Sequence, residues 1–137
     1  MVTLLTGKKG SGKTKKLIDM VNAALEKSNG NVVVIEKGQQ MTYNIPYAAR
    51  LVDSDAYHVK GQEALLGFIS GICAGNYDVT DIFVDSTLKI TGTGAEACDF
   101  LVPELKKLSE SAGTNFVLSI SAADEDIPQS VGDCVLK

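Results

Sequence analysis

Eight consecutive residues near the start of the chain have types and a spacing suited to binding phosphate. They follow the pattern G-x-x-x-x-G-K-[ST] without departure: Gly7, Lys8, Lys9, Gly10, Ser11, Gly12, Lys13 and Thr14. The glycines let the backbone curl so that several N–H groups converge on one anion. In this pattern the lysine, Lys13, contacts the β- and γ-phosphates, and the hydroxyl of Thr14 ligates Mg²⁺. The segment therefore predicts a site for a nucleoside triphosphate and a magnesium ion.

The segments on either side of this loop have the patterns that such a motif requires. Val2–Thr6 is a short apolar run typical of a strand, and it ends at Gly7. After the loop, apolar residues recur at helical spacing from Leu17 to Leu25, and Ser28-Asn29-Gly30 ends that pattern. A helix that begins at the loop directs the positive end of its dipole at the same anion. The motif thus lies between a predicted strand and a predicted helix.

Two acidic residues follow other apolar runs and complete the predicted site. Asp85 comes directly after Ile82-Phe83-Val84, where it would hold Mg²⁺ through the water shell of the ion. Glu36 follows Val32–Ile35, a strand pattern buried on both faces. Ligands of open α/β sheets gather at the carboxyl ends of the strands, so we predict that Glu36 orients the attacking water. The alternative is a solvated glutamate that begins a loop. The predicted catalytic residues and magnesium ligands are, respectively, Lys13 with Glu36 and Thr14 with Asp85.

The rest of the chain alternates helical and strand patterns. Gln62–Ala74 and Ala95–Ala112 have helical spacing, and Asn115–Ile120 is a further apolar strand. Near the end of that strand, Ser119 and Ser121 could sense the γ-phosphate, although small polar residues on a strand are the alternative. The alternation predicts an α/β, three-layer fold with a mainly parallel twisted sheet and helices on both faces.

Two stretches have weaker patterns. Met41–Ile45 and Arg50–Val52 are β-prone and separated by Pro46, which predicts a hairpin or an edge excursion within residues 38–57. Val131–Leu136 predicts an edge strand at the end of the chain. At 137 residues, with no linker or internal repeat, residues 1–137 form one predicted domain.

Composition narrows the partners. The net charge of −4 argues against a broad nucleic-acid surface, so we expect no nucleic-acid partner, although lysines crowd the loop. The three cysteines are widely spaced and odd in number, as for buried hydrophobes in a reducing compartment. No apolar run approaches the roughly 18 residues of a membrane helix, and the first residues lack the pattern of a signal peptide. These features predict a cytoplasmic protein.

The loop Gly7–Thr14, Glu36 after its apolar run, and the segment Asp81-Ile82-Phe83-Val84-Asp85-Ser86 together resemble the ATPase core of the RecA recombinase family. The resemblance extends over roughly residues 1–121. It implies a P-loop NTPase fold with a minimal RecA-like core, in which Glu36 is catalytic and Asp85 binds magnesium. The chain also closely resembles short bacterial proteins, common in anaerobic Gram-positives, that carry the label of twitching-motility (PilT-type) ATPase.

The sequence predicts an ATP-binding protein that hydrolyses ATP slowly, or with a partner, in the presence of Mg²⁺. ATP is chosen by elimination, because no N-K-x-D or T-K-x-D segment is present to recognise guanine. An activating arginine contributes about 10³–10⁵ in rate to such enzymes. Arg50 is the only arginine in the chain, so a homo-oligomer or a protein partner is expected to supply an activating residue.

Two alternatives stay open. The chain could be a regulatory or scaffold module that uses ATP as a conformational ligand without meaningful hydrolysis. It could also be a small-molecule kinase of the P-loop class. The kinase is disfavoured because lysines cannot replace the bidentate arginines that such enzymes place on migrating phosphates.

Overall fold

Strands and helices alternate along most of the chain in the computed structural model, which describes residues 1–39 and 44–136. The main elements are β1 (Val2–Gly7), α1 (Lys13–Lys27), β2 (Asn31–Glu36), β3 (Arg50–Asp53), α2 (Gln62–Gly75), β4 (Val79–Val84), α3 (Thr87–Thr91), α4 (Ala97–Ala112) and β5 (Asn115–Ser121). A short 3₁₀ helix lies between β3 and α2, at Ser54–Tyr57, and two more come after β5, at Asp124–Asp126 and Gln129–Cys134. In the described part of the chain, no helix has both the length and the apolar character needed to cross a membrane.

Over the described residues, the sheet has five strands in the order β1-β5-β4-β2-β3, and every neighbouring pair is parallel. The predicted parallel sheet is therefore confirmed. Because all strands run the same way, their carboxyl ends meet at one edge, where β1 ends at Gly7, β2 at Glu36 and β5 at Ser121. Asp85 follows the last residue of β4 at the same edge.

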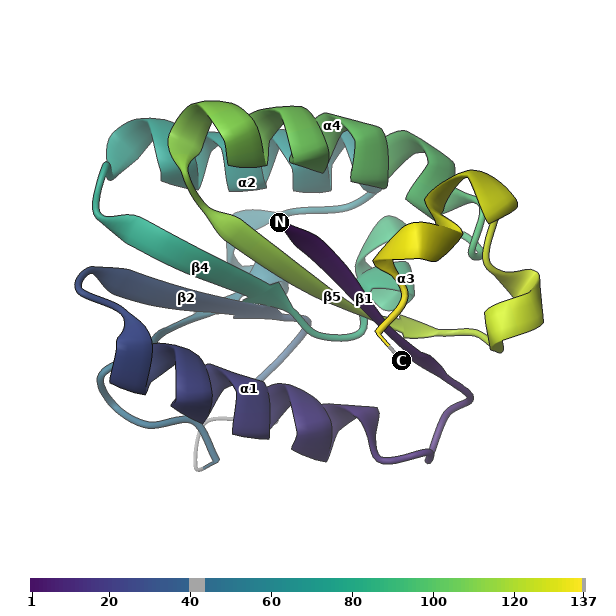
Figure 1. Cartoon of the computed structure of the whole chain (residues 1–137), viewed down its shortest axis with the longest axis horizontal. Coiled ribbons are helices and arrows are strands. Elements are labelled where there is room, and N and C mark those ends of the chain that lie inside the picture. Colours follow the sequence, from purple (N-terminus) through teal and green to yellow (C-terminus); the bar gives the residue numbers. More distant parts are fainter. Residues whose placement is uncertain (40–43, 137) are drawn as a thin grey trace.

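Helices cover both faces of this sheet, as expected from the sequence. Figure 1 shows α1 on one face and α2 with α4 on the other. Along β2, Val32 and Val34 belong to the apolar cluster that contains Leu17 and Val21 of α1. Val33 and Ile35, which alternate with them on β2, belong to the cluster formed with α2 and α4. The strand is thus buried on both faces, which is why it lacks polar alternation.

The predicted edge strand at Val131–Leu136 is wrong. Gln129–Cys134 forms a 3₁₀ helix, and of the predicted segment only Val135 makes a parallel bridge, to Leu4. The physical reason is the three-residue spacing of Val131 and Cys134, which buries both side chains on one side of a 3₁₀ turn.

In the stretch 38–57, the structure favours the edge excursion over a hairpin. Arg50–Asp53 forms β3 at the sheet edge and pairs in parallel with β2, from Val33 opposite Arg50 to Glu36 opposite Asp53. A parallel neighbour requires a crossover connection and cannot be joined by a hairpin turn. The β-prone segment Met41–Ile45 falls mostly on residues 41–43, which lie outside the described residues. The five-residue helix α3 was not predicted.

Candidate functional site

The glycine-rich loop Gly7–Thr14 joins β1 to α1 at the carboxyl edge of the sheet. Gly7, Gly10 and Gly12 have φ values of 141°, 85° and 88°, a backbone region that L side chains rarely adopt. A Cβ at Gly7 would also lie 2.5 Å from the Oγ of Ser11. The loop turns back on itself through a hydrogen bond from the Ser11 N–H to the Lys8 carbonyl, 3.1 Å. These residues therefore have to be glycines for the loop to curl in this way.

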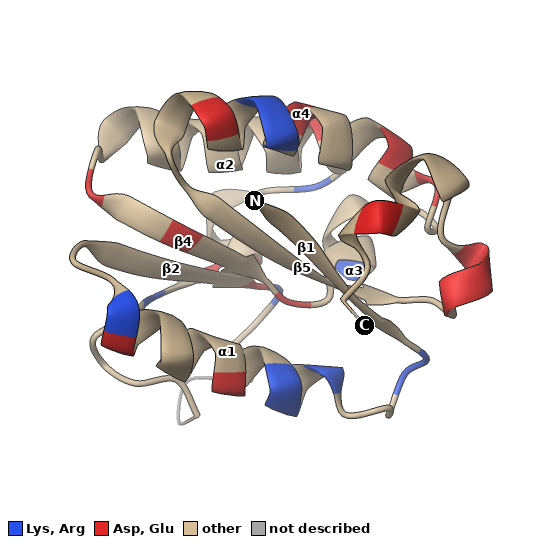
Figure 2. Ribbon diagram, viewed as in Figure 1, with Lys and Arg blue, Asp and Glu red and all other residues tan. Residues whose placement is uncertain are grey.

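The amino end of α1 faces the loop. Gly12 occupies the N-cap position and has no side chain that could occupy the N–H groups of the first turn. The first turn contains no acidic residue, and Figure 2 shows basic residues gathered at the loop and the start of α1. A helix amino end with free N–H groups and positive charge around it favours an anion.

Lys13 lies where the loop and the sheet edge meet. Its Nζ donates a hydrogen bond of 3.0 Å to the carbonyl of Lys8, within its own loop. Burial lowers the pKa of Lys13, and the nearby carboxylate of Asp85 opposes that effect. The ammonium is thus held beside the loop by a neutral carbonyl, a partner that a phosphate would outcompete.

Asp85 is the centre of a small hydroxyl network. Its Oδ1 accepts from the hydroxyl of Ser119 at 3.1 Å and lies 3.5 Å from the Oγ1 of Thr14, while its Oδ2 accepts from the hydroxyl of Ser86 at 3.2 Å. Ser119 also accepts the N–H of Ser86 at 2.8 Å. Thr14 and Asp85, predicted together as magnesium ligands, are therefore neighbours although 71 residues separate them. They offer one hydroxyl and one carboxylate, so an octahedral Mg²⁺ would take its other ligands from phosphate and water.

Sequence reasoning missed the turn that follows Asp85. Ser86 has φ 52°, a left-handed conformation unusual for a residue other than glycine. Its carbonyl accepts the N–H of Lys89 at 3.0 Å and so begins α3. Leu88 and Lys89 of α3 both line the cleft in front of the loop. The only signal in the sequence was a lysine four residues after the aspartate, which is too common to interpret.

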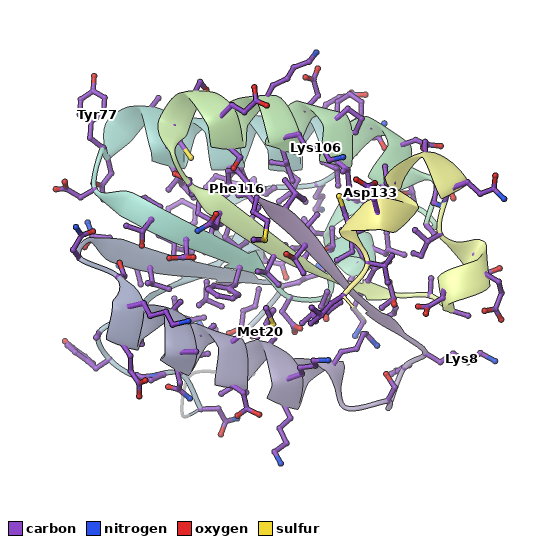
Figure 3. All side chains as sticks on the ribbon, in the orientation of Figure 1. Lys8, Met20, Tyr77, Lys106, Phe116 and Asp133 are labelled. Carbon is purple, nitrogen blue, oxygen red and sulfur yellow. The ribbon has the colours of Figure 1, made fainter. Side chains whose placement is uncertain are left out.

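The cleft at this edge has a volume of about 530 Å³, within the range of about 300–1,000 Å³ found for ligand sites. Six residues predicted to bind nucleotide or magnesium line it: Lys9, Gly10, Gly12, Lys13, Thr14 and Asp85. Asn44, Ser119 and Ser121 line it as well. Gly7 and Ser11 line a smaller cavity of about 200 Å³ beside the loop. Lys8 extends away from the body of the protein (Figure 3).

Glu36 lies beside Asp85 but in a different environment. The two strands pair through Ile35 and Val84, so the next residue of each chain, Glu36 and Asp85, end up adjacent. Two-residue alternation from Val34 directs Glu36 to the face that α1 covers. Glu36 is only 2% exposed and is not among the described residues that line the cleft. It is thus buried next to the predicted metal ligand, and its role as the water-orienting base stays a prediction.

Arg50 and the cysteines lie elsewhere. Arg50 is the first residue of β3, and it is not among the described residues that line the cleft. Cys73, Cys98 and Cys134 are free thiols, and all three are buried. Burial is the main cause that raises the pKa of each thiol, for Cys98 to about 11. The prediction that the cysteines are buried hydrophobes is confirmed.

Comparison with known proteins assigns no family to the chain. No family model matches it, and no curated protein matches it. What the structure itself defines is an α/β protein with a five-stranded parallel sheet and a glycine-rich loop at the carboxyl edge.

Proposed function

We propose that this chain is a P-loop protein with a RecA-like core that binds ATP together with Mg²⁺ and hydrolyses ATP slowly or with the help of a partner. One observation carries the proposal. Lys13, Thr14 and Asp85 line one cleft, with the Thr14 hydroxyl 3.5 Å from the Asp85 carboxylate. A loop amide nest, a lysine, a hydroxyl and a carboxylate are the parts that a magnesium–triphosphate complex needs.

The roles of the residues follow from their chemistry. Lys13 would neutralise charge on the β- and γ-phosphates, and Thr14 and Asp85 would hold the ion, directly and through water. Bound Mg²⁺ would draw charge from the phosphate oxygens. We propose a cytoplasmic location, and we expect no nucleic-acid partner because the net charge is −4.

Activation is expected to come from outside the chain. Arg50 is not among the described residues that line the cleft, and the cationic residues that do line it are Lys9, Lys13 and Lys89. A lysine acts as a point charge without the planar fork of arginine. The isolated chain should therefore turn over slowly, and a homo-oligomer or a protein partner would supply the activating residue.

A second candidate function, ATP binding without meaningful hydrolysis, is favoured by the burial of Glu36. A side chain that is 2% exposed cannot contact an attacking water in the cleft without a rearrangement around it. The Glu36→Gln variant separates the two candidates because glutamine keeps the size of the side chain but not its basicity. Lower turnover in Glu36→Gln supports hydrolysis through Glu36, and equal turnover excludes Glu36 as the base.

Isothermal titration calorimetry with Mg²⁺ and ATP tests the binding proposal directly. Lys13→Ala should bind about 10–150-fold more weakly, the equivalent of a lost charge-assisted hydrogen bond of about 1.5–3 kcal/mol. Asp85→Asn should lose the dependence of binding on Mg²⁺. Lys15 is exposed on α1 and does not line the cleft among the described residues, so Lys15→Ala is the matched control. A wild-type protein that binds no triphosphate with Mg²⁺ would falsify the proposal.

A further inference from the structure

A second cavity lies at the opposite end of the strands from the glycine-rich loop. It has a volume of about 500 Å³ and is bordered by Asn31, Arg50 and Asn76, which stand at or before the first residues of β2, β3 and β4. We call it the edge cavity. It shares none of the described residues that line the loop cleft. A ligand in the edge cavity would therefore be bound independently of the proposed nucleotide site.

The edge cavity exists because two helices do not fully cover five strands. On this face of the sheet, α4 packs mainly on β1 and β5, and α2 packs mainly on β4. The order of the sheet places β2 and β3 at one edge, beyond the strands on which α2 and α4 mainly pack. The flank of α2 that faces this edge is left partly open.

The walls of the edge cavity are apolar and aromatic. Val33 and Val52 form its sheet side, and Phe68 and Ile72 of α2 form its helix side. Tyr57 closes the outer edge, with its ring centroid 5.9 Å from that of Phe68, and is 54% exposed. An apolar hollow of this size, lined by side chains from β2, β3, α2 and the 3₁₀ helix Ser54–Tyr57, suits a small molecule with a ring or a short hydrocarbon body.

The polar groups of the edge cavity specify the rest of the ligand. Among the described residues that line it, Arg50 is the only cationic residue, and none is acidic. In residues 1–39 and 44–136, no acidic residue forms an ion pair with Arg50. A guanidinium binds a carboxylate through two parallel hydrogen bonds. The amides of Asn31 and Asn76 add hydrogen-bonding groups beside it.

We propose that the edge cavity binds a small molecule that combines an apolar ring or chain with a carboxylate, the carboxylate on Arg50 and the apolar part between Tyr57, Phe68 and Ile72. This proposal goes beyond nucleotide binding, and its test does not depend on whether the chain binds a nucleotide. The volume of the cavity, about 500 Å³, lies within the range found for small-molecule sites, which favours a small molecule over a protein segment.

The test uses a matched pair of probes, 1-naphthaleneacetate and its neutral amide, titrated into the full chain and followed by amide chemical shifts in NMR spectra. The acid should shift residues of β2, β3 and α2 in a saturable way and bind at least tenfold more tightly than the amide, as a charge-assisted contact of about 1.5–3 kcal/mol implies. Arg50→Met should remove that preference for the acid, and Arg50→Lys should keep only part of it.

Asn76→Asp is a second variant that leaves Arg50 unchanged. The Oδ1 of Asn76 accepts the N–H of Asp78 at 2.9 Å, and an aspartate keeps that acceptor while it adds a negative charge. Asn76→Asp should therefore weaken the binding of the acid and leave the binding of the amide unchanged. Equal binding of acid and amide by wild type overturns the proposal, and so does an absence of saturable shifts at millimolar probe. If the chain forms a dimer in sedimentation and Tyr57 lies in the dimer interface, the proposal is also overturned, because a second copy would then occupy the cavity.

Discussion

The hydroxyl of Ser119 should be required both for the stability of the sheet edge and for the placement of Asp85. Ser119 is 1% exposed, donates to the Asp85 carboxylate at 3.1 Å and accepts the N–H of Ser86 at 2.8 Å. Ser119→Ala removes both hydrogen bonds and adds no bulk. The Ser86 N–H then loses the partner that holds a left-handed turn, and α3 begins at that turn.

The size of the effect follows from the two groups left without this partner. A buried group that loses its hydrogen bond costs about 1–3 kcal/mol. The carboxylate of Asp85 keeps the hydroxyl of Ser86 as a partner and borders the cleft. The loss of its hydrogen bond to Ser119 should therefore cost close to the lower of these two values. We therefore expect the free energy of unfolding to fall by about 2–3 kcal/mol, which for a chain of this size lowers Tm by about 6–12 °C.

Thermal and urea unfolding measure this change, with Ser121→Ala as the matched control. Ser121 lies two residues further along β5 and is exposed, so its variant should stay within about 0.5 kcal/mol of wild type. If the proposed function holds, Ser119→Ala should also lower the affinity for Mg²⁺ in the presence of ATP by about 10–100-fold. Residues that orient a metal ligand typically have an effect of this size. A Ser119→Ala protein as stable as Ser121→Ala would refute the reasoning. Lost stability with an unchanged Mg²⁺ dependence would leave Ser119 a purely structural role.

Three further predictions concern other parts of the chain. Gly7→Ala should lose triphosphate binding in calorimetry while keeping its fold by circular dichroism, because a Cβ would lie 2.5 Å from the Oγ of Ser11 and φ is 141°. Lys89→Met should reduce the affinity for the Mg²⁺–ATP complex by about tenfold or more, because one charged contact to the ligand is lost. Lys15→Met should leave this affinity unchanged. The Cys98 thiol, with its pKa raised to about 11 by burial, favours folding fully below the ordinary thiol pKa near 9. That contribution should be lost as pH rises through 11, about 2–3 kcal/mol in urea unfolding that Cys98→Ala does not show.

The parts of the fold that the sequence predicted are those encoded by local patterns. The apolar runs of β2, β4 and β5 and the helical spacing of α2 and α4 gave their positions to within a few residues. Parallel strands buried on both faces have continuous apolar runs, so even the layer arrangement could be inferred. The five-residue α3 escaped because it is too short to show a helical period, and its start depends on one unusual φ at Ser86.

The candidate site was predictable only where it is continuous in the chain. The loop Gly7–Thr14 is a single segment, so its residues could be identified together. Every other group reaches the cleft through the order of the strands, which residue patterns do not determine. β5 lies between β1 and β4, and for that reason Ser119 can join the carboxylate of Asp85 to the turn at Ser86. A different strand order would have left Ser119 as an ordinary polar residue on a strand.

The same strand order explains why Glu36 and Asp85 are adjacent and yet differ in access. β2 and β4 are neighbours, so their carboxyl ends place two acidic residues side by side on the face of α1. Asp85 lines the cleft, whereas Glu36 is covered. A base that acts on water has to be within about 3 Å of it. Hydrolysis through Glu36 therefore requires the cover over Glu36 to move, and binding at Asp85 requires no such movement. For this reason the burial of one carboxylate, and not the glycine-rich loop, separates an ATPase from an ATP-binding module.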